Sequence, residues 1–242
     1  MRWLSVALVL SALSACGTPS SQSAGGSNLR IADAALGSGS PAVALQVLDT
    51  MLKSEPRNVE ALLRQGRANL QLGNAAAAEV SYRRVLAVEG ANVEAQLAVG
   101  KLLLGSNAAE AEKYFAAVLT SEPKNTAALN NLGITRDLQG RHAEAQDTYR
   151  RALALNPGMA SAQQNMALSF TVSGRPQEGA VMLNQMASAG TGGRKVRDNL
   201  AVALALSGET SQANQVLREE LNSADTAIAL EGFRALKPSQ LP

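Results

Sequence analysis

Aromatic side chains, histidine and cysteine are all scarce in this chain of 242 residues. Only 3% of the residues are aromatic while 46% are hydrophobic, a balance that favours closely packed helices over sheets. The formal net charge is only +2, and no run of Lys and Arg forms a phosphate-binding stripe. We therefore expect no nucleic acid partner. The apolar content is too high for a disordered chain, so the length predicts one or two globular units.

The scarcity of histidine and cysteine also leaves no recognisable catalytic set. The only histidine, His142, has no second histidine or cysteine for a metal and no neighbour in a nucleophile motif. The stretches GSGS and GTGG are turns, because no GxxxxGK[ST] phosphate loop follows a predicted strand. The carboxylates lie at helical spacing and read as solvated faces rather than an acid/base pair. We expect no enzymatic activity, no metal, no cofactor and no small-molecule substrate.

The N-terminus carries an apolar run that is too short to cross a bilayer. The chain begins MRWLSVALVLSALSAC, where Arg2 precedes apolar and small residues from Trp3 to Leu13; a spanning helix needs about 20 residues. These features are typical of a secretory signal, predicted over residues 1–15. The end of the run resembles a bacterial lipobox, which implies lipidation of Cys16. The alternative is an ordinary cleaved signal with an incidental cysteine. Gly17, rather than aspartate, follows, which implies an outer-membrane anchor with the protein facing the periplasm.

From Leu29 onward the sequence repeats with a period of about 34 residues. Each unit has a small residue, a second small residue about twelve positions later, a bulky residue four positions after that, and a turn signal. The first small residues of the six units are Ala32, Gly66, Gly100, Gly133, Ala167 and Ala201. This pattern resembles the tetratricopeptide repeat. It implies an all-α, right-handed superhelical solenoid of about six helix-turn-helix units, and the alternative is a compact helical bundle with accidental spacing.

Glycine at the start of the repeat pattern requires an explanation, because inside a helix it costs about 1 kcal/mol relative to alanine. We interpret Gly133 as a close contact with Ala145 of the second helix, with Tyr149 filling the wider gap one turn further on. Gly140 and Gly174 are predicted to end first helices with positive φ.

The remaining segments flank the predicted solenoid of residues 29–223. Residues 16–28 are predicted to be a flexible tether, because they are rich in Gly and Ser. Residues 224–242 include the amphipathic stretch DTAIALEGFRALK, which we predict to be a capping helix over the last apolar face, followed by a tail.

The candidate binding site is the concave face, which the first helix of every unit would line. Its stripe consists of the positions two before and one after the first small residue. Early units place cations there, whereas the last three place an asparagine and an aliphatic residue, and Leu138, Val172 and Leu206 extend the stripe. The candidate peptide-binding residues are Arg64, Arg67, Lys101, Asn131, Ile134, Asn165, Leu168, Asn199 and Val202.

This stripe suits an extended peptide. An asparagine amide both donates and accepts, so it can pair with a peptide backbone. The aliphatics would hold apolar side chains, and the arginines could meet an acidic side chain or a terminal carboxylate. The alternative is that asparagine at this position serves helix packing alone.

Whole phrases extend the resemblance beyond the repeat itself. The stretches NNLGITRDLQGRHAEAQDTYRRALALNP, NMALSFTVSGRPQEGA and VRDNLAVALALSGETSQA are similar to the TadD family, the tetratricopeptide lipoproteins of tight-adherence (Flp) pilus assembly. The resemblance implies a protein-protein interaction scaffold whose partners are pilus or secretin assembly components. The alternative is a lipoprotein adaptor that docks and regulates cell-wall enzymes.

Overall fold

The computed structural model describes residues 21–218, together with residues 226 and 228. Within residues 21–218 the chain forms twelve α-helices and no strand. None of the described helices is long and apolar enough to cross a bilayer. The helices are α1 (Ser21–Gly37), α2 (Pro41–Ser54), α3 (Val59–Gln71), α4 (Ala75–Val88), α5 (Val93–Leu103), α6 (Ala108–Ser121), α7 (Thr126–Leu138), α8 (His142–Leu155), α9 (Ala160–Val172), α10 (Pro176–Ser188), α11 (Gly193–Leu206) and α12 (Thr210–Arg218).

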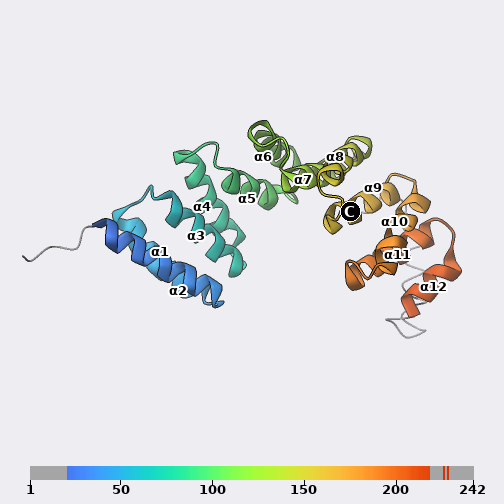
Figure 1. The fold of residues 1–242 in the computed structure, drawn as a ribbon, viewed down its shortest axis with the longest axis horizontal. Coiled ribbons are helices and arrows are strands. Elements are labelled where there is room, and N and C mark those ends of the chain that lie inside the picture. Colours follow the sequence, from blue (N-terminus) through green and yellow to red (C-terminus); the bar gives the residue numbers. More distant parts are fainter. Residues whose placement is uncertain (1–20, 219–225, 227, 229–242) are drawn as a thin grey trace, which may run out of the picture.

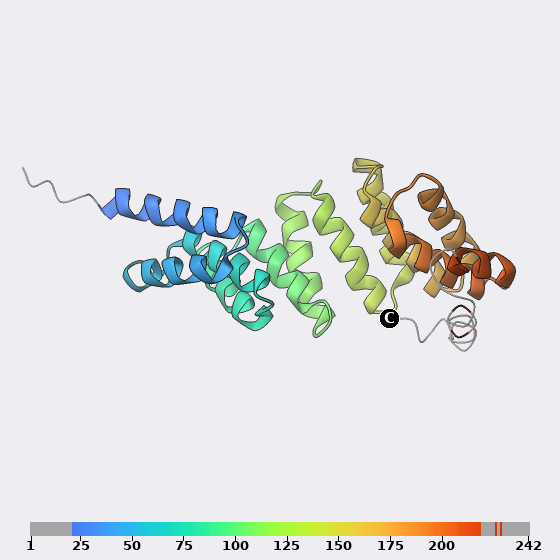
Figure 2. The ribbon, with the colours of Figure 1, turned by 90° about the horizontal axis from the view of Figure 1, so that it is seen from below.

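The helices stack in chain order into a bent, elongated array (Figure 1). Each helix packs on the next, and first helices of neighbouring units also meet, as α7 does with α9 and α9 with α11. In the middle of the array α6 and α8 lie on the outer side of the bend, and Figure 2 shows the same order from below. The predicted all-α stack of six helix-turn-helix units is confirmed.

Helix α1 begins at Ser21, so it includes residues 21–28, which were predicted to belong to the tether. Extending a helix that is already nucleated adds one hydrogen bond per residue fixed, and α1 continues in this way through Gly25 and Gly26 despite their low helix propensity. Three of the predicted features lie outside the described residues. They are the signal peptide, the lipidation site Cys16 and most of the capping helix.

The glycines of the repeat make room for an aromatic ring. A Cβ built on Gly133 would lie 2.6 Å from Cζ of Tyr149, and one on Gly66 would lie 2.6 Å from Cζ of Tyr82. Gly100 stands against the ring of Phe115 in the same way, at 2.7 Å. Tyr149 therefore stands directly against Gly133, and not one turn further on as predicted, since the atoms nearest to the added Cβ belong to its ring. The absence of a side chain on the glycine of the first helix thus leaves room for the buried aromatic ring of the second helix.

Units without an aromatic ring carry alanine in place of the glycine. Ala32, Ala167 and Ala201 occur in the units whose bulky residue is leucine, and all three alanines are fully buried. The leucines, Leu48, Leu183 and Leu217, lie in the same cores as these alanines. Gly with an aromatic and Ala with leucine are thus two ways of filling one repeating space.

Caps and turns set the helix ends. Asn58, Asn92 and Asn125 precede the first helices of units 2 to 4, and each Oδ1 accepts from a backbone N–H three residues later, at 2.9 to 3.1 Å. Each Nδ2 also donates to a glutamate three residues earlier, at 2.7 to 2.9 Å. Gly140 and Gly174 end α7 and α9 with φ of 73° and 86°, which confirms their predicted role.

The buried apolar residues divide into two large clusters and a small one. The first runs from Ala32 to Leu132, and the second runs from Ala167 to Leu217. Between them lies a small cluster of Leu129, Ala152 and Ala162. The boundary between the two large clusters therefore falls around α8, between Leu132 of α7 and Ala167 of α9.

Candidate functional site

The predicted stripe lies on the first helices of units 2 to 6. Arg64 and Arg67 belong to α3 and Lys101 to α5, while the asparagine and aliphatic pairs belong to α7, α9 and α11. Arg67 and Lys101 are exposed, whereas the aliphatics Ile134, Leu168 and Val202 are half-buried.

The arginines of the stripe are paired with acids of neighbouring units. Arg64 Nε donates to Asp33 Oδ1 at 2.7 Å, and its Nη2 donates to Asp33 Oδ2 at 3.0 Å. Arg67 Nε donates to Glu94 Oε1 at 2.6 Å. The hydrogen bond from Arg64 holds the pKa of the Asp33 carboxyl below its ordinary value, although its partial burial opposes the shift. Both guanidinium groups are thus engaged in joining units, so an acidic ligand would have to compete with Asp33 and Glu94.

The three asparagines occupy different environments. Asn131 is buried, at 7% exposure. Asn165 donates through Nδ2 to Oδ1 of Asn130, at 3.0 Å, and so joins α9 to α7. Nδ2 of Asn199 and Nε2 of Gln164 are buried and have no hydrogen-bond partner among the described residues. Asn165 thus makes a contact between helices through one of its donors, while the amide of Asn199 has an unused donor among the described residues.

A hollow of about 130 Å³ opens between α7 and α9, on the aliphatic part of the stripe. Three of the predicted residues line it, namely Ile134, Asn165 and Leu168. The remaining lining residues are Asp137, Leu138, His142, Tyr149, Ser169 and Val172. The hollow does not include Arg64, Arg67, Lys101, Asn131, Asn199 or Val202.

The polar part of this hollow is built around the carboxylate of Asp137. Oδ1 accepts from the hydroxyl of Ser169 at 2.7 Å and lies 2.8 Å from Nδ1 of His142, while Oδ2 accepts from the hydroxyl of Tyr149 at 2.9 Å. Burial raises the pKa of Tyr149 above its ordinary value, and the charge and hydrogen bonding of Asp137 add to the shift. Tyr149 therefore stays protonated as a donor, and the carboxylate is held in one orientation.

Sequence reasoning missed Asp137, His142, Ser169 and Tyr149 as members of the site. Asp137, His142 and Ser169 do not recur from unit to unit, so periodic positions do not reveal them, and Tyr149 occupies the recurring bulky position, which was assigned to packing. One signal in the sequence did mark Asp137. It is a charged residue at a repeat position where units 2, 3, 5 and 6 have the uncharged residues Leu70, Leu104, Thr171 and Ala205.

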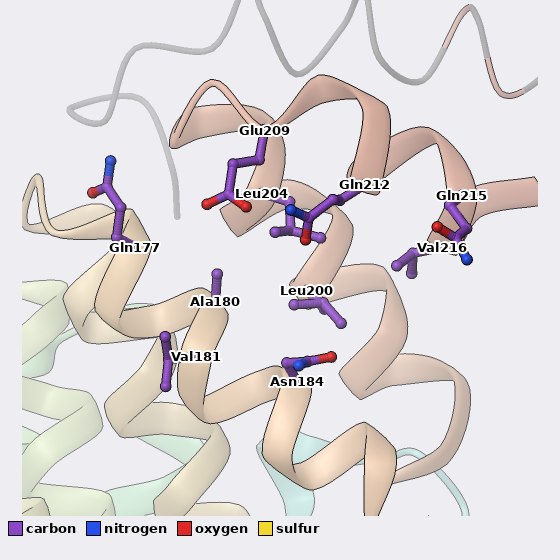
Figure 3. Close-up of a pocket in the computed structure, with 10 residues that line it drawn as sticks. All are labelled: Gln177, Ala180, Val181, Asn184, Leu200, Leu204, Glu209, Gln212, Gln215 and Val216. Atoms are coloured by element: carbon purple, nitrogen blue, oxygen red, sulfur yellow. The ribbon is translucent and has the colours of Figure 1, made fainter.

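A second hollow, of about 440 Å³, lies off the predicted stripe, among α10, α11 and α12 (Figure 3). Ala180 and Leu204 contribute apolar surface to it, and both are nearly fully buried. Amide side chains from α10 and α12, including Gln177 and Gln212, surround this surface (Figure 3). This hollow was not predicted, because second helices contribute to it and the predicted stripe consists of first helices only.

No group of three or more His, Cys, Asp or Glu suited to a metal occurs within the described part of the chain.

Comparison with protein families matches the tetratricopeptide repeat over residues 29–94 and 102–160. These two ranges together span more than half of the chain. The human protein "FK506-binding protein-like" is 38% identical over 66 residues, which are 27% of this chain. The chain matches only 19% of the length of that relative.

Solved structures share the fold over a larger part of the chain. PilW, described as a widely conserved type IV pilus biogenesis factor, is similar with a TM-score of 0.74 and 19% identity, over 86% of this chain and 98% of PilW. PilF of Pseudomonas aeruginosa is similar with a TM-score of 0.69 and 19% identity, over 89% of this chain and 99% of PilF. MamA from Desulfovibrio magneticus RS-1 covers 68% of the chain, with a TM-score of 0.63 and 21% identity. At these identities the likeness is one of fold.

Proposed function

The chain belongs to the tetratricopeptide repeat family, and on that premise we propose that it is a non-enzymatic interaction scaffold for pilus assembly. Its concave stripe holds an extended segment of a pilus or secretin component. Stacked repeats present such a stripe as one continuous surface, because each unit repeats the same outward positions on its first helix.

The observation that carries the proposal is the hollow between α7 and α9. Residues chosen from sequence as peptide contacts, Ile134 and Leu168, line it together with Leu138 and Val172, which extend the same stripe. An apolar recess with polar groups at one end is the usual form of a side-chain subsite in a binding surface. The exposed Leu138, at 48%, leaves apolar area uncovered at its edge.

The assignment to pilus assembly has two supports of different kinds. Three phrases of the sequence resemble the TadD family, and the fold is similar to PilW and PilF over most of the chain. We propose further that Cys16 is lipidated and anchors the protein to the outer membrane, facing the periplasm. Membrane retention of a Cys16→Ser variant would contradict that anchor.

Surface pili in a deletion strain test the proposal. We expect the deletion to abolish pili and the wild-type gene to restore them, whereas an Ile134→Asp, Leu168→Asp double variant should not restore them. Charges on these aliphatics would make the recess unsuitable for an apolar contact. The matched control is Val43→Asp with Val80→Asp, which alters two exposed valines of second helices, at 51% and 60% exposure. Normal pili in the deletion strain, with altered cell-wall turnover, would instead indicate the cell-wall adaptor.

A further inference from the structure

The hollow between α7 and α9 combines aliphatic walls with one fixed carboxylate. Ile134, Leu168 and Val172 are half-buried, and Leu138 is exposed at the edge. Asp137 is the only Asp, Glu, Lys or Arg among the lining residues. The two nearby arginines, Arg136 and Arg141, are paired with Glu112 and not with Asp137. Arg136 Nε lies 3.4 Å from Glu112 Oε1, and Arg141 Nη1 lies 2.7 Å from Glu112 Oε2.

Asp137 keeps capacity for one more donor. A carboxylate offers about four lone-pair sites, and the three contacts from Ser169, His142 and Tyr149 occupy two sites on Oδ1 and one on Oδ2. The Asp137 side chain is 18% exposed, so a group that entered the hollow could reach the carboxylate while displacing little water. Oδ2 is therefore the atom with a free acceptor position.

The chemistry of the occupant follows from these two features. An apolar side chain would cover the carboxylate and leave its charge without compensation, which is costly. An acidic side chain would be repelled. A lysine or arginine places an aliphatic stem against aliphatic walls and a cation at the carboxylate, which satisfies both surfaces. The volume of about 130 Å³ is well below that of sites for small-molecule ligands, about 300 Å³ and more, and suits part of one side chain.

We propose that this hollow is the subsite for one basic side chain, lysine or arginine, of the bound segment. The stem lies among Ile134, Leu138, Leu168 and Val172, and the cationic head donates to Asp137. The inference rests on the proposed function, since it needs a segment on the concave stripe, and it gives that segment a required residue. It also reverses the polarity expected from Arg64 and Arg67, which are paired within the solenoid.

Departure from the repeat supports this assignment. Asp137 stands four residues after the first small residue of its unit, where units 2, 3, 5 and 6 have Leu70, Leu104, Thr171 and Ala205. If the position served packing alone, an uncharged residue would suffice, as it does in those units. The contacts with Ser169, His142 and Tyr149 use three acceptor positions of this largely covered carboxylate, and recognition of a cation would use the fourth.

Binding of peptide pools to the purified full-length protein tests the proposal. Four pools of random peptides share one fixed central residue each, either Lys, Arg, Leu or Glu, and their apparent dissociation constants are measured by fluorescence anisotropy. We expect the Lys and Arg pools to bind the wild type about tenfold more tightly than the Leu pool, as for one charge-assisted hydrogen bond. In Asp137→Asn this preference should disappear, so that the Lys, Arg and Leu pools bind with similar dissociation constants.

The matched control is Asp147→Asn, which removes the same charge from an exposed site on α8, where the side chain is 66% exposed and pairs with Arg150. It should leave the preference unchanged. If Asp137→Asn does not fold, Leu138→Lys serves instead. It places a competing cation at the exposed edge and should abolish the preference.

The outcomes separate the two proposals. Binding without a basic preference, or a preference that persists in both Asp137→Asn and Leu138→Lys, overturns the basic subsite and leaves the scaffold function standing. No binding of any pool to the wild type overturns both.

Discussion

At the residue scale, the fold depends on how one repeating space is divided between two side chains. Glycine leaves room for a ring in units 2 to 4, and alanine stands with leucine in units 1, 5 and 6. The intrinsic penalty of about 1 kcal/mol for a helical glycine is offset by the burial of a large aromatic side chain. The two residues of each unit should therefore be energetically coupled.

A double-mutant cycle on Gly133 and Tyr149 measures this coupling. Gly133→Ala alone should lower the free energy of unfolding by about 1–3 kcal/mol, because the new Cβ overlaps the ring of Tyr149. Tyr149→Leu alone should also destabilise. The double variant recreates the pair found at Ala167 and Leu183, so we expect it to be at least about 1 kcal/mol more stable than the sum of the two changes predicts.

Urea unfolding of the four proteins provides the measurement. Gly37→Ala is the control, because a Cβ there meets nothing within 4 Å and its φ is not positive, so it should be neutral or stabilising. Additive effects at Gly133 and Tyr149 would contradict a shared space.

At the element scale, polar side chains fix the angle between neighbouring helices. Glu112 on α6 is the clearest case, since its carboxylate accepts from Arg136 on α7 and from Gln139 and Arg141 in the turn that precedes α8. Burial raises the pKa of the Glu112 carboxyl, but the hydrogen bonds from Arg141, Gln139 and Arg136 outweigh burial and lower the pKa below its ordinary value. Three elements are thus joined through one charged group.

Glu112→Gln should therefore destabilise the protein in a pH-dependent way. A lowered folded-state pKa means that the stabilisation is fully present above the unfolded value, about 4.3, and is lost as pH falls through the folded value. At neutral pH we expect the variant to lose about 1 kcal/mol of unfolding free energy. Below about pH 4 the difference from wild type should shrink.

Unfolding by urea across this pH range checks the sign. Asp198→Asn is the control, because its pair with Arg194 spans 3.6 Å between exposed side chains and should contribute little at any pH. A difference between Glu112→Gln and wild type that grows in acid would show that the carboxylate is not the stabilising form.

Much of this architecture was predictable from the sequence, because it repeats. The helix pairs, Gly140 and Gly174 as helix ends, and the aliphatic stripe all recur at the repeat period. The partners of Arg64 and Arg67 were not predicted, since Asp33 and Glu94 lie 31 and 27 residues away, on helices of the adjoining units. Asp137 was missed for the opposite reason, because a residue that occurs in one unit alone has no periodic signal.

At the scale of the whole molecule, the apolar core is not uniform along the stack. The large buried aromatics Tyr82, Phe115 and Tyr149 lie in units 2 to 4, whereas Phe170, at 6% exposure, is the one buried aromatic residue in α9 to α12. Aromatic side chains bury the largest apolar areas. The joint between units 4 and 5 combines the small apolar cluster of Leu129, Ala152 and Ala162 with polar contacts, including those of Asp137 and Gln146 with Ser169. The recess proposed for binding thus lies at the boundary between the two large apolar clusters.

We therefore expect the stack to open in two steps, with α9 to α12 losing amide protection at lower denaturant than α3 to α7. In a linear array each unit is stabilised by its neighbours, so two separate apolar clusters can behave as separate cooperative groups. Native-state hydrogen exchange with increasing urea, read by mass spectrometry, measures the order in which the helices lose protection.

Two substitutions test whether the groups are separate. Leu183→Ala, at a fully buried site of the second cluster, should increase exchange in α9 to α12 while sparing α3 to α5. Leu62→Ala, equally buried in the first cluster, should do the reverse. If either substitution increased exchange uniformly from α1 to α12, the stack would be one cooperative unit, and the two-step opening would be contradicted.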